Sequence, residues 1–300
     1  MPRQLSGLFA PVVTPFTAEG DLDRAAFAAN VRAHLGEGLA GVVTAGSSGE
    51  AALLDDDERV ALVELARGGG GREATVIAGV GGESTRATVR RARAAAAAGA
   101  DLVLVVAPHY YGRRMGDAAL GAHYRAVADA SPVPVLLYNI PAYAHFALSP
   151  SLVAALGEHP NVAGLKDSAG DVVTLAAYVE AMGPGRVLTG HAGTFAEALA
   201  HGAAGGILAA ALFAPGLVRG VLEAHRAGDL AGARAGQARL APLGRDVVAP
   251  LGPAGLKCAM ELVGLAGGAP RPPLLPCSAE ERALVGERLA AAGVLAAAAA

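Results

Sequence analysis

Residues 133–166 read VPVLLYNIPAYAHFALSPSLVAALGEHPNVAGLK and contain one complete unit of the pattern that decides the fold. A short apolar run at 133–138 is followed by a helical pattern at 149–158 and by a second apolar run at 162–166. Ser149 before Pro150 is a helix start signal, because serine caps the first turn and proline is tolerated there. The stretch therefore predicts a strand, a helix and a second, parallel strand.

The same alternation extends along most of the 300 residues. Further strand-length apolar runs occur at 8–13, 41–44, 75–78, 102–107, 187–189 and 206–209. Further helical patterns occur at 23–35, 55–67, 84–98, 116–130, 171–182 and 194–201. Eight strand–helix units predict an α/β fold of the (β/α)₈ TIM-barrel type. The alternative is an open doubly wound sheet, but the first strand is followed by Val13-Thr14-Pro15-Phe16 and not by a glycine-rich dinucleotide turn.

After the eighth unit the pattern becomes all-helical, with periodic segments at 228–243, 254–265 and 278–292. We expect a catalytic barrel over residues 1–225 and a C-terminal helical appendix over residues 226–300. The alanine-rich end at 290–300 has little to fix it in place, so we expect it to fray.

Composition excludes several classes of protein. The net charge is −3, and no Arg or Lys run is interleaved with aromatic residues, which argues against nucleic-acid binding. The apolar runs are far shorter than the roughly 20 residues of a membrane span, and no signal peptide is evident. Cys258 and Cys277 form no close-spaced motif, which argues against a disulfide framework or a zinc site. A cytoplasmic enzyme is the expected class.

Lys166 closes the apolar run at 162–166, where a buried strand should end. Burial among apolar neighbours disfavours the charged form of a lysine, so part of it becomes free amine near neutral pH. A free amine is a nucleophile for ketones. The alternatives are a lysine that extends to solvent at the strand end or one that pairs with Asp167.

Other polar side chains also terminate predicted strands, and in a barrel of this type the carboxyl ends of the strands build the active site. These ends are Gly46-Ser47-Ser48-Gly49-Glu50, Pro108-His109-Tyr110-Tyr111, Tyr138-Asn139-Ile140-Pro141 and Lys166-Asp167-Ser168. Each taken alone has a structural explanation as a turn or a packed tyrosine. Together they place an amine, phenols, hydroxyls and loop amides around one barrel mouth, as Schiff-base chemistry on a 2-oxo acid requires.

Three of these segments resemble a known family, the dihydrodipicolinate synthase and N-acetylneuraminate lyase family of class I pyruvate-dependent aldolases. Residues 46–50 match its G-[TS]-[TS]-G-E loop, residues 138–141 its Y-N-x-P strand end, and residues 164–168 its G-[IL]-K-[DE]-[ST] segment. The resemblance runs from residue 6 to about residue 290, and Arg271-Pro272-Pro273-Leu274 is a weaker match within it.

The resemblance implies roles for individual residues. Lys166 would form an imine with pyruvate or another 2-oxo acid, and Tyr138 would move the protons. Ser47 would pass protons between Tyr138 and Tyr110, and Tyr110 would reach in from a neighbouring subunit. The protein would then be a homo-oligomer, either a dimer or a tetramer.

The resemblance also implies how the substrate is held. Ser48, with the amides of the loop that begins at Gly46, would hold the substrate carboxylate, and Ile207 would line the pyruvate pocket. No metal or organic cofactor is expected, because a protonated imine is itself an electron sink. The expected partners are pyruvate or another small 2-oxo acid and an aldehyde, with no nucleic acid and no membrane.

The second substrate is less closely defined. The family's dihydrodipicolinate synthases carry an arginine two residues after Y-N-x-P for the carboxylate of aspartate semialdehyde, but here that position is Tyr143. His145 lies nearby and could supply a cation, or could be a half-exposed surface histidine. Gly190 and His191, followed by Thr194, are candidates for the distal part of the substrate, although this segment could equally be a plain turn with His191 toward solvent.

These features favour an aldolase for sugar-acid-derived or other 2-oxo acids, or a related 2-keto-3-deoxy sugar acid dehydratase. The alternative within the family is 4-hydroxy-tetrahydrodipicolinate synthase, which serves lysine biosynthesis. Outside the family, the glycines at 190, 193, 205 and 206 could bind a phosphate ester, or the fold could be a non-catalytic scaffold. Retention of Lys166, Tyr138, Ser47 and Tyr110 together argues against a scaffold, which has no need for that set.

Overall fold

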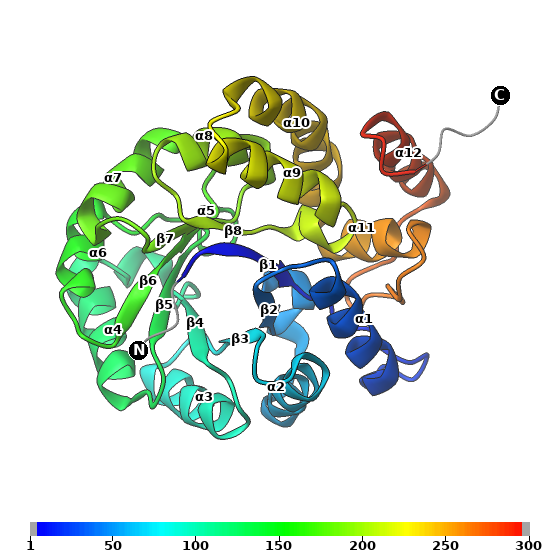
Figure 1. Ribbon diagram of the computed structural model, residues 1–300. Helices are drawn as coiled ribbons and strands as arrows, with labels where there is room; N and C mark the ends of the chain where they lie inside the picture. The colour runs from blue at the N-terminus through cyan, green and yellow to red at the C-terminus, as the bar shows by residue number, and fades with distance from the viewer. Residues whose placement is uncertain (1–4, 296–300) are drawn as a thin grey trace.

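The computed structural model describes residues 5–295, and its strands close into a barrel (Figure 1). Each strand pairs in parallel with the next, and the last pairs with the first. The strands are β1 (Gly7–Pro11), β2 (Gly41–Thr44), β3 (Thr75–Gly79), β4 (Leu102–Val106), β5 (Val135–Asn139), β6 (Val162–Asp167), β7 (Val187–Thr189) and β8 (Gly205–Ile207). The predicted TIM barrel is confirmed, and the open doubly wound sheet is excluded.

Helices connect the strands and surround them, as Figure 1 shows. They are α1 (Arg24–Gly36), α2 (Asp56–Gly70), α3 (Thr85–Ala97), α4 (Asp117–Ala130), α5 (Pro141–Ala144), α6 (Pro150–Gly157), α7 (Val172–Met182) and α8 (Phe195–Ala200). The predicted start signal at Ser149 acts as a cap, since its side chain accepts from Leu152 N–H. Asp55 and Glu58 form a capping box at the start of α2. α5 was not expected, because one turn is too short to show a periodic apolar pattern.

The core has two layers because successive strand residues point to opposite sides of the sheet. Side chains facing the inside of the barrel form a compact cluster that includes Phe9, Ile77, Leu136, Leu188 and Ile207. A larger cluster fills the space between the strands and the helices. The interior is therefore packed, and reactive groups can be exposed only at its ends.

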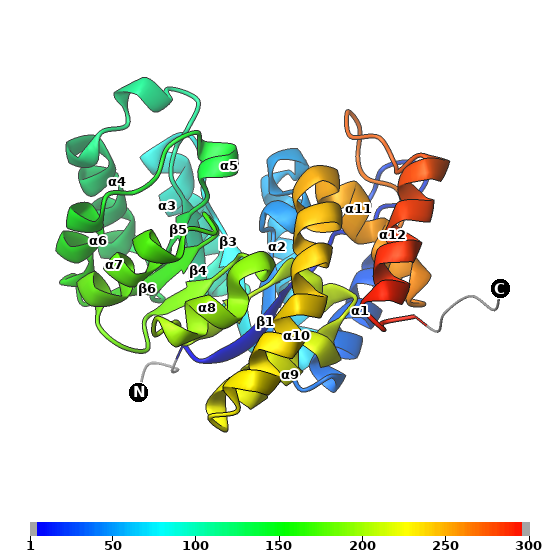
Figure 2. The same ribbon diagram turned by 90° about the horizontal axis from the view of Figure 1, so that it is seen from above.

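The C-terminal part is helical, as predicted, and gathers on the side of the barrel where α1 lies (Figures 1 and 2). It contains α9 (Pro215–Arg226), α10 (Leu230–Leu243), a π-helical turn η6 (Gly244–Val248), α11 (Ala249–Leu262) and α12 (Ala279–Ala291). The helical segment at 244–251 was missed, because prolines and glycines interrupt its pattern. The chain does break at Gly252, where φ is 51° within α11.

The fraying expected over 290–300 does not occur within the described residues: α12 extends to Ala291, and the N–H groups of Gly293 and Val294 donate to the carbonyls of Ala290 and Leu289. The rest of the predicted segment, residues 296–300, lies outside the described residues. Within residues 5–295, no helix combines the length and apolar character needed to cross a membrane.

Candidate active site

Lys166 and Tyr138 face each other inside one end of the barrel. They are register partners on β6 and β5, so backbone pairing sets their relative position. The Lys166 Nζ atom lies 4.2 Å from the centroid of the Tyr138 ring. Lys166 is 5% exposed, and Tyr138 belongs to the interior cluster. The lysine is therefore buried and does not extend to solvent.

Asp167 points to the opposite side of β6, which removes the other structural explanation of the lysine. The Asn139 side-chain amide donates to Asp167 Oδ1 at 2.7 Å, and Asn139 Oδ1 accepts from Leu148 N–H at 3.0 Å. Burial raises the pKa of the Asp167 carboxyl, although the Asn139 hydrogen bond acts against this. Sequence reasoning assigned no role to this pair, which ties the ends of β5 and β6 together directly behind the two reactive groups. The sequence does contain a signal for this contact, because Asn139 directly follows Tyr138 and Asp167 directly follows Lys166 at the two strand ends.

Ser47 extends the constellation from β2. It lies in a short 3₁₀ turn, η1 (Ser47–Gly49), which also carries Ser48 and follows Gly46. The Ser47 Oγ and Tyr138 hydroxyl oxygens are 3.4 Å apart, within hydrogen-bond distance. An amine, a phenol and a hydroxyl therefore lie in sequence at the barrel mouth, an arrangement suited to moving protons beside an amine nucleophile.

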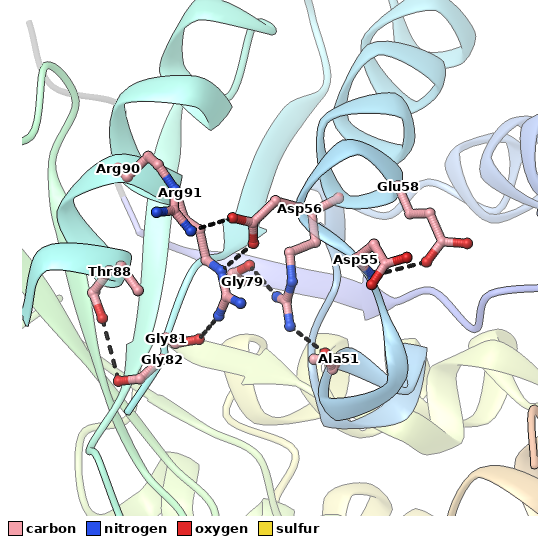
Figure 3. Close-up of polar contacts among 12 residues, drawn as sticks. Ala51, Asp55, Asp56, Glu58, Gly79, Gly81, Gly82, Thr88, Arg90 and Arg91 are labelled. Atoms are coloured by element: carbon pink, nitrogen blue, oxygen red, sulfur yellow. Dashed lines mark hydrogen bonds and ion pairs between the residues drawn. The ribbon is translucent and has the colours of Figure 1, made fainter. Parts of the chain in front are cut away.

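The loop that holds Ser47 has unusual backbone geometry. Ala45 and Glu50, on either side of it, have φ values of 48° and 58°. Non-glycine residues in this region of conformational space cost free energy and persist only where the surroundings hold them. Arg59 holds one side by donating to the carbonyls of Ala51 and Gly79, which are drawn in Figure 3.

The loop after β7 borders Lys166. The Gly190 N–H donates to the Asp167 carbonyl at 2.6 Å, and a Cβ atom at Gly190 would lie 2.8 Å from Lys166 Cε. The half-buried His191 places its Nδ1 atom 3.0 Å from Thr194 Oγ1 and packs beside Gly193. Burial lowers the pKa of His191. His191 is therefore only partly exposed and is held within its own turn by Thr194, and its predicted contact with the substrate stays a prediction.

Two other predicted residues also lie at this end. Ile207 ends β8 and is fully buried in the interior cluster. Tyr143, on α5, is 49% exposed, and its hydroxyl faces the break at Gly252. Burial raises the pKa of Tyr143, and the nearby Tyr138 adds to the effect. His145 is exposed at the end of α5.

Tyr110 is the predicted residue that the single chain does not bring to the others. Its side chain is 78% exposed and makes an edge contact with Tyr111 at 5.0 Å between ring centroids. Its backbone N–H donates to Glu83 at 2.9 Å. This position leaves the phenol available to a neighbouring subunit, and its predicted role across an interface stays a prediction.

Comparison with known proteins agrees with this geometry. The sequence model of the dihydrodipicolinate synthetase family matches residues 4–292. The chain belongs to this family. The enzyme class expected from the sequence, a class I carbon–carbon lyase, is thereby confirmed.

Relatives match this family member over almost their whole length. A 4-hydroxy-tetrahydrodipicolinate synthase of Exiguobacterium sp. is 36% identical, covering 93% of this chain and 94% of the relative. One of Synechococcus sp. is 37% identical, covering 97% of this chain and 96% of the relative.

Solved structures superpose equally well. A dihydrodipicolinate synthase from Acinetobacter baumannii complexed with pyruvate gives a TM-score of 0.92 at 30% identity, covering 97% of this chain and 100% of that chain. A prophage protein of the same family from E. coli, also in complex with pyruvate, gives 0.91 at 30% identity, covering 97% and 99%.

Proposed function

We propose that the enzyme makes or breaks a carbon–carbon bond between pyruvate and an aldehyde through an imine on Lys166. The observation that carries this proposal is the buried Lys166 amine over the Tyr138 ring, with Ser47 next to the phenol. Two structurally similar family members are described in complex with pyruvate, which supports pyruvate as the 2-oxo acid.

In the proposed reaction, the neutral Lys166 amine attacks the ketone carbon of pyruvate, and a water molecule leaves as the imine forms. The protonated imine accepts electrons when a methyl proton is removed, which yields an enamine that attacks the aldehyde carbon. Water then hydrolyses the imine and releases the product. Tyr138 carries protons at these steps, and Ser47 relays them toward Tyr110 of a neighbouring subunit.

The pyruvate carboxylate would be bound by Ser48 and the loop amides that follow Gly46, since these groups belong to the loop that carries Ser47. Ile207 would border the methyl group from β8. Gly190 leaves the space that the Lys166 side chain occupies.

The aldehyde would extend toward Tyr143, His191 and Thr194, which offer hydroxyl and imidazole groups. The position two residues after Y-N-x-P is Tyr143, and His145 is exposed at the far end of α5. These features favour a hydroxylated, sugar-derived aldehyde, or the corresponding 2-keto-3-deoxy sugar acid as substrate of a dehydratase. The names of the relatives favour a second candidate, condensation with aspartate semialdehyde as in 4-hydroxy-tetrahydrodipicolinate synthase.

A phosphate-ester site is a weaker explanation of the glycines after β7 and in β8, because close packing accounts for them. A Cβ atom at Gly193 would lie 2.8 Å from His191, and one at Gly206 would lie 2.9 Å from Leu208. At Gly205, φ is 151°, and a Cβ atom would collide with the backbone of Gly7.

A homo-oligomer is part of the proposal, because Tyr110 can join the relay only from a second chain. A cytoplasmic location is proposed as well, and the free thiols of Cys258 and Cys277 are in keeping with a reducing compartment. The proposed division into a barrel at 1–225 and a helical region at 226–300 would appear as a protease-sensitive boundary near residue 226.

The test is intact-mass spectrometry after incubation with pyruvate and sodium borohydride, followed by peptide mapping. We expect one adduct per chain, on Lys166. If no adduct forms while a known family member is trapped under the same conditions, the imine mechanism with pyruvate is wrong. Turnover of pyruvate with aspartate semialdehyde and with neutral hydroxyaldehydes then distinguishes the two candidate substrates.

A further inference from the structure

Glu50 is a buried carboxylate that the proposed chemistry does not use. It directly follows the turn that carries Ser47 and Ser48, and its N–H donates to the Ser47 carbonyl at 3.2 Å. Its left-handed backbone, with φ of 58°, requires support from its surroundings. Its side chain is completely shielded from solvent.

That support comes from the C-terminal helical region. The Nζ atom of Lys257, on α11, lies 2.6 Å from Glu50 Oε1, and the Lys257 side chain is 1% exposed. Lys257 also donates to the Ala269 carbonyl at 2.9 Å and lies 4.6 Å from the centre of the Phe16 ring. Burial lowers the pKa of Lys257, and the Glu50 carboxylate acts against this by favouring the charged amine.

Arg271 provides a second attachment from the same region. Its backbone N–H donates to Glu50 Oε2 at 2.8 Å, and its guanidinium donates to the Leu53 carbonyl at 2.7 Å. The guanidinium also pairs with Glu58 at 2.6 Å. Both carboxylate oxygens of Glu50 are thus held by the C-terminal region, one by Lys257 and the other by Arg271.

The opposite side of the loop is held by α2. Arg59 contacts the Ala51 and Gly79 carbonyls, and Figure 3 shows the neighbouring Asp55–Glu58 capping contact at the start of α2. Arg59 fixes the loop to its own barrel segment, whereas Lys257 fixes it to helices that come much later in the chain. The position of Ser47 and Ser48 therefore depends on α11 as well as on the barrel.

We propose that Lys257 is a positioning residue: its buried ion pair with Glu50 holds the Ser47–Ser48 turn in the geometry that binds the pyruvate carboxylate and meets Tyr138. The inference rests on the proposed function, because it assigns pyruvate binding to that turn. It gives the C-terminal helical region a direct part in substrate binding, although Lys257 itself touches no reacting atom.

The test compares three variants by the pyruvate concentration that gives half-maximal borohydride trapping. The double variant Glu50→Gln/Lys257→Met removes both charges, so that neither charge is left buried alone. Glu50→Gln keeps the side-chain shape but leaves a single acceptor oxygen for two donors. Arg282→Gln is the matched control, because it breaks an exposed ion pair with Glu261 at 2.9 Å between α12 and α11, without contact to the loop.

We expect the double variant to need at least about tenfold more pyruvate, equivalent to about 1.4 kcal/mol, with the adduct still on Lys166. Glu50→Gln should need at least as much pyruvate as the double variant, because it leaves the Lys257 amine buried without a carboxylate partner. Arg282→Gln should stay within about twofold. A purely structural role would reduce the fraction of trappable protein and leave the half-maximal concentration unchanged. Circular dichroism provides the folded fraction for each variant.

A folded double variant with wild-type half-saturation would overturn the inference. If the double variant does not fold, Glu50→Gln serves as the test. A wild-type pyruvate concentration for half-maximal trapping in Glu50→Gln would then overturn the inference. Failure of the proposed function looks different, because the wild type itself would then give no adduct on Lys166.

Discussion

Gly190→Ala tests whether the space beside Lys166 is required for imine formation. The added Cβ would lie 2.8 Å from Lys166 Cε and would overlap the Ser168 hydroxyl. The backbone of Gly190 is not in the left-handed region, so alanine brings no conformational strain there. The effect of the substitution is therefore steric.

The size of the effect of Gly190→Ala depends on which neighbouring groups can move away from the added Cβ. Lys166 Cε and the half-buried Ser168 hydroxyl belong to side chains that can rotate away, whereas the strand backbone cannot. Overpacking of this kind costs about 1–3 kcal/mol. If that cost falls on the reactive position of the amine, trapping slows by roughly 5-fold to 150-fold. The fold should be little changed, because the clash is relieved by side-chain rotation.

The assay is the rate of borohydride trapping at saturating pyruvate, with thermal unfolding measured alongside. Gly220→Ala is the control for the same substitution, since Gly220 is exposed within α9 and a Cβ atom added there would meet no other group within 4 Å. That control should trap normally and gain about 0.5–1 kcal/mol of stability. A Gly190→Ala rate within twofold of the wild type would refute the steric argument.

Other changes test the remaining groups. Lys166→Ala should abolish trapping, and any adduct found elsewhere by peptide mapping would move the nucleophile. Tyr138→Phe keeps the ring beside the amine but removes the hydroxyl near Ser47, so turnover should fall by roughly 10²- to 10⁴-fold while slow trapping continues; normal turnover would exclude it as the proton carrier. Tyr110→Phe should lower turnover and spare imine formation, and unchanged turnover would remove it from the relay.

The dependence of stability on pH tests the burial of two histidines. Burial lowers the pKa of His34 and of His123 from 6.5 to about 4. The unfolded chain therefore binds more protons than the folded chain between these values, and stability falls as the pH drops through this window. At pH 5 the loss should be about 2 kcal/mol per histidine relative to pH 7. Urea unfolding at both pH values measures it, and equal stabilities would contradict the assignment.

The barrel could be predicted because each strand is an apolar run of defined length followed by a helical pattern, and several of these helices begin with a capping residue such as Ser149. Errors at strand ends were small: the first strand was expected at 8–13 and is observed at Gly7–Pro11. Beyond it, the chain turns to hold the next loop, where Thr14 donates to the Gly49 carbonyl at 2.7 Å. Such a tertiary contact has no signature in local periodicity.

The candidate site likewise contains some residues that local sequence patterns predict and others that only tertiary contacts reveal. Lys166 and Tyr138 could be predicted because each ends an apolar run, and parallel pairing brings adjacent strand ends together. The pairing of Glu50 with Lys257 could not, since it joins distant parts of the chain and Lys257 lies within a predicted helix rather than at a strand end. The predicted contact of Tyr110 with a second chain stays a prediction, because a contact between two chains leaves no mark on the order of residues in one.

Tyr138 and Lys166 are paired directly across β5 and β6. Their placement is therefore independent of the loops that follow the strands. The hydrogen-bond register of the sheet sets the distance between Tyr138 and Lys166. Tyr143 and His191 instead lie on the connections that follow the strands. Under the proposed function, those connections contact the aldehyde and can be replaced or lengthened to accept a new one while Tyr138 and Lys166 keep their separation. Changes in the loops after the strands would then alter the choice of aldehyde without moving the two residues held by the sheet.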